Sequence, residues 1–121
     1  MKTKKRVGAK RVDKLVEAWA TLMVLATYSH PTAMSDRSAP DRYGTMLGLA
    51  EKAWLCINPY CVLKGGKMDM ALIGPMSKIE LLLQLTRNDG VVEPERRLSV
   101  THEVAVDAIA MFDTLIEADS F

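Results

Sequence analysis

Apolar residues recur at helical spacing in several segments of this chain, and this periodicity constrains the fold more than any other feature. Runs that alternate between apolar and polar residues, as in a half-buried strand, are few, and no Asn-Gly turn separates two apolar runs. The pattern therefore predicts an all-α protein in which each helix buries one apolar face. For the first helix, the predicted inner positions are Val12, Leu15, Val16, Trp19, Leu22, Met23 and Ala26.

Turn-forming residues divide the periodic segments into a compact single-domain bundle of four main helices. At 121 residues the chain is long enough for one domain with its own core. A basic N-terminal arm over residues 1–9 is expected to precede a single helical domain over residues 10–121, which also carries a short helical turn near 68–73. The four main helices are predicted at about 10–28, 39–57, 77–88 and 100–117.

Capping signals set these expected boundaries. Ser38, Ser77 and Ser99 are the expected N-caps of the last three helices, since a serine hydroxyl accepts a hydrogen bond from a free backbone N–H of the first turn. Gly74-Pro75 is expected to separate the short turn from the third helix. Pro94 disfavours helix in the residue before it, so the stretch ahead of the last helix is predicted to be extended or irregular.

Composition excludes several classes of protein. Hydrophobic residues make up 49% and charged residues 26% of the chain, as in ordinary globular proteins. The longest nearly apolar run, residues 18–26, is less than half of the roughly twenty residues needed to span a bilayer. The basic start is not followed by the apolar segment and cleavage site of a secretory signal. The sequence thus predicts a cytoplasmic protein that does not enter a membrane.

Residues suited to catalysis or metal binding are few. The only cysteines are Cys56 and Cys61, and the only histidines are His30 and His102. A nucleophile–base pair or a zinc site would have to be assembled from these four, yet their spacing matches no short zinc motif. We expect free, partly buried thiols, no catalytic residues, no metal site and no cofactor, and therefore a protein that is not an enzyme.

Charge is distributed very unevenly along the chain. Residues 1–14 carry seven of the sixteen Lys and Arg against one acid, a net charge of +6. The other residues carry nine bases and fourteen acids, a net charge of −5. From Leu98 to the C-terminus there are five acids and neither Lys nor Arg. The sequence therefore describes a basic segment attached to an acidic body.

The basic segment predicts a small regulatory protein that contacts DNA or RNA phosphates, because clustered bases release condensed counterions from a phosphate backbone. Its partner would be a nucleic acid or a nucleic-acid-handling protein. The segment has no aromatic residue to stack on bases, so base recognition is not expected. The predicted phosphate contacts are Lys2, Lys4, Lys5, Arg6, Lys10, Arg11 and Lys14.

Two other interpretations of the charge pattern stay open. The segment is a solvated tail, or it docks on acidic residues of its own chain or of a second copy in a homo-oligomer. Acids four residues apart on the last helix repel one another mildly, which favours a basic partner surface. As an alternative function, the protein is an adaptor or inhibitor whose acidic helix face binds a basic protein surface. That face consists of Glu103, Asp107, Asp113 and Glu117.

Overall fold

The computed structural model describes residues 2–30, 39–63, 65–88, 90 and 92–120 and confirms the all-α four-helix fold. Helix α2 has the predicted bounds, and the short 3-10 helix η2 (Asn58–Tyr60) follows it directly. Within the described ranges no strand forms, and β-structure is limited to one bridge between Val62 and Met68. The four helices are α1 (Lys2–Ser29), α2 (Ala39–Ile57), α3 (Met70–Arg87) and α4 (Pro94–Ser120).

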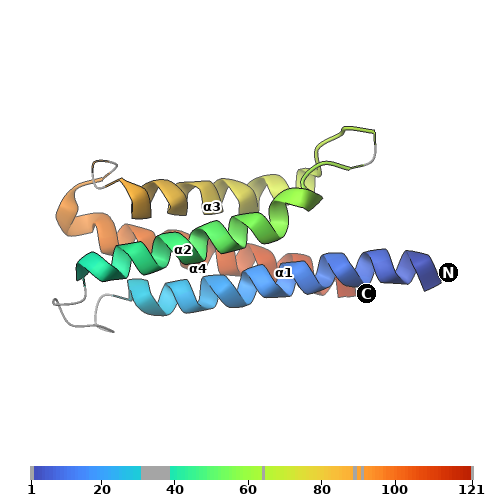
Figure 1. The fold of residues 1–121 in the computed structure, drawn as a ribbon, viewed down its shortest axis with the longest axis horizontal. Helices are drawn as coiled ribbons and strands as arrows, with labels where there is room; N and C mark the ends of the chain where they lie inside the picture. The colour runs from blue at the N-terminus through green and yellow to red at the C-terminus, as the bar shows by residue number, and fades with distance from the viewer. Residues whose placement is uncertain (1, 31–38, 64, 89, 91, 121) are drawn as a thin grey trace.

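The helices form a bundle in which sequence neighbours run antiparallel (Figure 1). Helices α1 and α3 each pack against both α2 and α4. Two ends follow from this arrangement. We call the end where α3 begins and α4 terminates the Asp69 end, and the end where α1 and α3 terminate the Ser29 end. The first turns of α1 project past the Asp69 end (Figure 1).

Small residues line the helix contacts of the core. Five alanines are fully buried, and they allow the helix backbones to approach closely while larger side chains fill the space between them. Fully buried large residues include Leu22, Met46, Ile79 and Phe112. Burial of these apolar side chains is the main stabilising contribution to the bundle. The five buried alanines are Ala18, Ala50, Ala53, Ala105 and Ala108.

The predicted inner face of α1 is partly wrong. Val16 is 40% and Met23 is 44% exposed, although both were assigned to the core. The core positions include Ala18 and Leu25, both 0% exposed. The second half of α1 is apolar nearly all round, so its sequence does not single out one face. The fully buried face is completed by a small residue, Ser29.

Helices α1 and α4 begin earlier than predicted. Helix α1 starts at Lys2, so residues 2–9 belong to a helix and not to a separate arm. Helix α4 starts at Pro94 because proline suits the first helical position, where no backbone N–H is needed. Ser99 is therefore not an N-cap: it lies inside α4 and donates its hydroxyl to the carbonyl of Arg96. The prediction of an extended or irregular stretch before residue 100 is therefore wrong from Pro94 onward.

Helix α3 also begins before its predicted start, because Asp69 is its N-cap. The Asp69 carboxylate accepts a hydrogen bond of 3.0 Å from the backbone N–H of Ala71. Gly74-Pro75 does not interrupt the helix; proline there removes only one backbone hydrogen bond, close to the helix start. Ser77 is inside α3 and donates its hydroxyl to the Ile73 carbonyl, so it is not the N-cap that was predicted. The predicted cap Ser38 lies outside the described residues.

Arg97 closes the connection between α3 and α4. Its Nε donates to the carbonyl of Leu85 at 2.7 Å, and one terminal nitrogen donates to Thr86 at 3.1 Å. These carbonyls are in the last turn of α3, where a cation is also favoured by the helix dipole. The guanidinium lies 3.7 Å from the ring centre of Tyr43 on α2. One side chain of α4 thus joins three helices at the Ser29 end.

The structure predicts which leucines stabilise the fold. Leu25→Ala should lower the free energy of unfolding by about 2–5 kcal/mol, because it removes fully buried methyl groups and leaves a cavity. Leu55→Ala is the matched control: Leu55 is 65% exposed, so the change should stay within about 0.5 kcal/mol. Urea unfolding monitored by circular dichroism measures both, and equal losses would contradict the described packing of α1.

Candidate nucleic-acid interface

The predicted phosphate contacts divide into two groups along α1. Lys2, Lys4, Lys5 and Arg6 occupy the first turns, whose helical backbone projects past the Asp69 end (Figure 1). Lys10, Arg11 and Lys14 lie where α1 enters the bundle. The basic segment is therefore a helical extension of α1, and we call residues 2–10 the basic extension.

Arg11 holds the root of the basic extension to the bundle. Its Nε donates to Asp119 on α4, and a terminal nitrogen donates to Asp69, the N-cap of α3; both separations are 2.5 Å. The Arg11 side chain is only 22% exposed. Burial lowers the pKa of the Arg11 guanidinium, but the hydrogen bonds to Asp119 and Asp69 outweigh it, so the pKa is raised overall. Arg11 is thus engaged within the chain.

Asp69 connects α1 to the start of α3. One carboxylate oxygen accepts the Ala71 N–H, and the other accepts from Arg11. Neither Asp69 nor Asp119 was among the predicted site residues. A signal for Asp69 was present, since an aspartate directly before an apolar run is a typical helix N-cap. Its pairing with Arg11 had no such signal, because the two residues are 58 positions apart.

Lys10 and Lys14 are exposed on α1. The Lys14 ammonium lies 3.1 Å from the Glu17 carboxylate, one helical turn away. That hydrogen bond raises the pKa of Lys14 and lowers the pKa of Glu17. An exposed pair of this kind is weak and exchanges readily with other ions. Both lysines are therefore available to an external anion.

A tight turn lies at the same end of the bundle. Between η2 and α3 the chain reverses, with Leu63 N–H donating to the Lys67 carbonyl and Asp69 N–H donating to the Cys61 carbonyl. Gly65 and Gly66 have φ values of +91° and +81°, which other residues rarely adopt. Because Asp69 closes the turn and also binds Arg11, this turn is fixed relative to the basic extension.

The acidic face of α4, which consists of Glu103, Asp107, Asp113 and Glu117, is exposed. All four of its residues are solvent-exposed, and they lie on the side of the helix away from the core. Asp107 has an ion pair of 3.5 Å with Lys78 on α3, and its side chain remains 59% exposed. Among the described residues of α4 after Leu98 no Lys or Arg neutralises this face. Among the residues whose side chains are described, Arg11 links the basic segment to α4 through its ion pair with Asp119.

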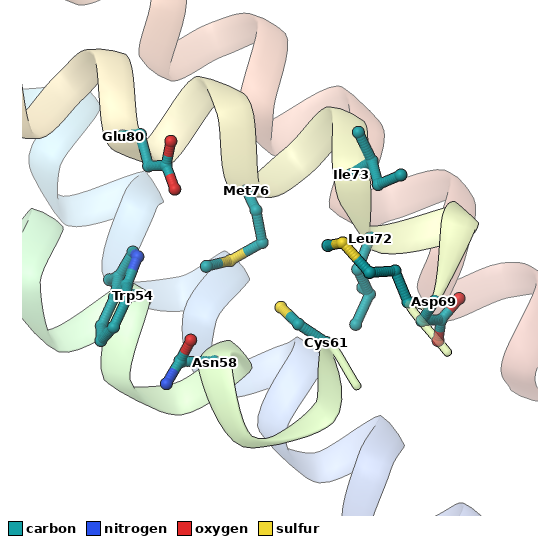
Figure 2. A pocket seen from close by; sticks show the side chains of 9 residues that line it. Trp54, Asn58, Cys61, Asp69, Leu72, Ile73, Met76 and Glu80 are labelled. Atoms are coloured by element: carbon teal, nitrogen blue, oxygen red, sulfur yellow. The ribbon is translucent and has the colours of Figure 1, made fainter. Parts of the chain in front are cut away.

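The two cysteines are free and buried, as expected. Cys61 borders a small cavity of about 120 Å³ between η2 and α3. Figure 2 shows its thiol directed into the cavity, opposite Met76 and Trp54, with the Glu80 carboxylate at the rim. Burial raises the pKa of the Cys61 thiol, and the charges of Asp69 and Glu80 raise it further. A thiol kept protonated in this way is a poor nucleophile.

The structure brings the two histidines together and leaves the cysteines apart from them. The ring centres of His30 and His102 are 5.2 Å apart at the Ser29 end, whereas the Cys61 carbonyl accepts a hydrogen bond from the Asp69 N–H at the other end. The Cys–His dyad and the four-residue zinc site weighed from the sequence are therefore not assembled. Among the described residues, no group of three or more His, Cys, Asp and Glu side chains is arranged to hold a metal ion.

Comparisons with known proteins give no match to a family model, a curated protein or a solved structure. Among the described residues, no helix is long and apolar enough to cross a membrane. We therefore infer the function from the charges and contacts described above.

The Arg11 contacts predict a measurable contribution to stability. Arg11→Gln should lower the free energy of unfolding by about 1–3 kcal/mol, because it leaves two partly buried carboxylates without their cation. Lys10→Gln removes an exposed base from the adjacent position and should change stability by less than about 0.5 kcal/mol. Urea unfolding measures both. A double-mutant cycle with Asp119→Asn should show coupling, and strict additivity would contradict the pairing.

The cavity predicts how Cys61 responds to alkylation. In the folded protein, iodoacetamide should modify Cys61 at pH 8 more slowly than in urea, because the raised pKa leaves little thiolate. Glu80→Gln removes one of the charges that raise this pKa and should accelerate the reaction severalfold. Glu95→Gln, an exposed change on α4, is the control. Mass spectrometry distinguishes the two cysteines, and identical rates for both variants would contradict the described environment.

The raised pKa of Cys61 also determines how this thiol makes the stability of the folded protein depend on pH. A thiol whose pKa is raised in the folded state favours folding below its unfolded pKa, which is near 9.0. That contribution is lost as the pH rises through the higher pKa of the folded protein.

Proposed function

We propose that the protein is a small, non-enzymatic regulatory protein that binds the phosphates of DNA or RNA through the basic extension of α1. The observation that carries this proposal is the placement of four bases on helical turns that project beyond an acidic bundle (Figure 1). The bundle, with its net negative charge, would repel a polyanion, so contact is directed to the extension. A cytoplasmic location is part of this proposal.

The electrostatics of the extension itself support an anionic partner. Lys2, Arg6, Lys10 and Lys14 are spaced four residues apart, so like charges repel along the helix. The first turn of α1 contains no acid, and bases there are opposed by the positive end of the helix dipole. Both effects favour a polyanion at this helix terminus. Helix formation in the extension and phosphate binding should therefore reinforce each other.

Arg11 has a different role from the other predicted phosphate contacts. Its side chain forms ion pairs with Asp69 and Asp119. These two pairs fix the direction in which the extension leaves the bundle. The exposed Lys67, in the turn that Asp69 closes, adds a base at the same end. We infer that the interface consists of the basic extension, Lys14 and Lys67, with Arg11 as a positioning residue.

The alternative function also has a specific observation in its favour. Glu103, Asp107, Asp113 and Glu117 are all exposed, and the described part of α4 after Leu98 contains no Lys or Arg. A protein with a basic surface, including one that handles nucleic acid, would fit this face by charge complementarity. In that case the protein acts as an adaptor or inhibitor, and its affinity depends on α4 instead of α1.

A salt titration of duplex DNA binding tests the main proposal. The full chain should lose affinity steeply as salt rises, by about 0.9 log units per log unit of salt for each phosphate contact. Lys4→Gln with Lys5→Gln should reduce that slope by about 2, because two contacts are lost. Circular dichroism should show a gain of helix on binding. Fluorescence anisotropy of a labelled duplex measures the affinity.

The matched control removes two exposed bases elsewhere. Lys52→Gln with Arg96→Gln changes the net charge equally and should leave the slope unchanged. Equal slopes for both double variants would overturn the proposal, as would a flat slope for the unmodified chain. The alternative function predicts a different result: the chain does not bind DNA but binds polylysine. If substitution of the four residues of the acidic face by Gln then abolishes polylysine binding, the acidic face is the functional surface.

A further inference from the structure

We propose that the Asp69 end of the bundle binds the surface of a lipid bilayer that contains anionic lipids. Exposed apolar side chains of the turn between η2 and α3 would enter the headgroup region, while neighbouring bases bind lipid phosphates. Lipid binding of this kind goes beyond the proposed nucleic-acid binding and does not depend on it. Four residues, which we call the apolar turn, carry the apolar part of the surface: Val62, Leu63, Met68 and Met70.

The apolar turn concentrates large apolar side chains in a short stretch of the surface. Ten such side chains are exposed among the described residues, and four of them fall within residues 62–70. Met70 is the most exposed of the ten, at 77%. Single exposed apolar residues are ordinary on a protein surface, whereas a group of them marks an interaction site.

The backbone of the turn is already ordered, and it projects from the bundle (Figure 1). Val62 and Met68 form an antiparallel bridge, and the Leu63 N–H donates to the Lys67 carbonyl at 2.6 Å. The Gly66 N–H donates to the Leu63 carbonyl at 3.0 Å. Because these bonds fix the backbone before binding, little conformational entropy is lost when the turn meets a partner. A projecting tip suits contact with a broad surface.

Bases predominate around the apolar turn. Lys67 is exposed within it, and the sequence contains no acid between Asn58 and Met68. The basic extension, which contains five Lys and Arg, projects from the same end of the bundle (Figure 1). These bases outnumber the exposed acids Asp13 and Glu117 near this end. The negative surface potential of an anionic leaflet therefore attracts the Asp69 end.

The ion pairs of Arg11 join the apolar turn to the basic extension. Asp69 follows Met68 directly, and its carboxylate binds Arg11 at the root of the extension. Asp119 of α4 binds the same guanidinium. Both carboxylates are thus paired with a cation and repel an anionic surface less than free acids would. The turn is held next to the root of the extension, so both can contact one bilayer.

The combination of apolar and basic residues distinguishes a bilayer from a nucleic acid. A lipid phosphate offers the bases the same contact as a nucleic-acid phosphate, but only a bilayer also takes up exposed aliphatic side chains. Firm attachment to a membrane surface takes two signals, such as an apolar anchor and a polybasic segment. It needs no helix that spans the bilayer, and none of the described helices could do so. We therefore replace the expectation that the protein has no membrane partner with contact at the bilayer surface.

Sedimentation with lipid vesicles tests this surface. The full chain should bind vesicles of phosphatidylserine and phosphatidylcholine in equal parts, and each base that reaches the surface should add about fivefold to the affinity. Leu63→Gln with Met70→Gln should weaken this binding by at least about tenfold, because two exposed aliphatic side chains no longer enter the headgroup region. Urea unfolding should be unchanged, since both side chains are exposed. The salt dependence of duplex DNA binding should also be unchanged, which separates this surface from the phosphate contacts.

The matched control makes equivalent changes elsewhere on the bundle. Leu55→Gln with Val24→Gln removes exposed apolar side chains of α2 and α1 and should leave vesicle binding unchanged. Vesicles of phosphatidylcholine alone should bind the unmodified chain much more weakly. The proposal is overturned if the unmodified chain does not bind the anionic vesicles, or binds the neutral ones equally well. Equal affinities of the two double variants for anionic vesicles would also overturn it. If the turn variant instead converts an oligomer into a monomer with unchanged vesicle binding, the turn contacts a second copy and the proposal is wrong.

Discussion

The ion pairs of Arg11 with Asp69 and Asp119 hold α1, α3 and α4 together at the Asp69 end of the bundle. Each carboxylate belongs to a different segment: Asp69 caps α3 and closes the preceding turn, and Asp119 lies near the end of α4. A guanidinium presents several donors in one plane, so one arginine can bind both at once. The direction of the basic extension and the position of the turn both depend on this contact. No other base of the basic segment whose side chain is described makes a contact of this kind.

The contact also explains how opposite charges coexist in a small protein. The basic segment is attached to an acidic bundle, and Arg11 pairs with Asp69 and Asp119 where α1 meets the start of α3 and the end of α4. Beyond that point α1 leaves the bundle, and the acidic face of α4 stays exposed (Figure 1). The protein therefore presents separate basic and acidic surfaces. This separation is what makes both a phosphate partner and a basic protein partner chemically reasonable.

Much of the fold was predictable because helix type depends on local sequence. The predicted bounds of α2 agree with the structure, and the four-helix count is confirmed. The errors at the starts of α3 and α4 have a common cause. Serines at positions 77 and 99 and prolines at 75 and 94 fit two local structures each, and the choice depended on Asp69 as a stronger cap and on packing. The inner face of α1 was misassigned because an almost wholly apolar segment does not specify its own orientation.

The candidate sites show the same division. The sequence by itself determined the helical class, the segregation of charge and the exposure of the acidic face, because these follow from periodicity and composition. Only the tertiary structure decided that Arg11 pairs with Asp69 and Asp119, that Cys61 faces a cavity beside Glu80, and that His30 meets His102 across 72 positions of sequence. Helix packing determines such pairs, since it brings together residues whose separation along the chain carries no local signal.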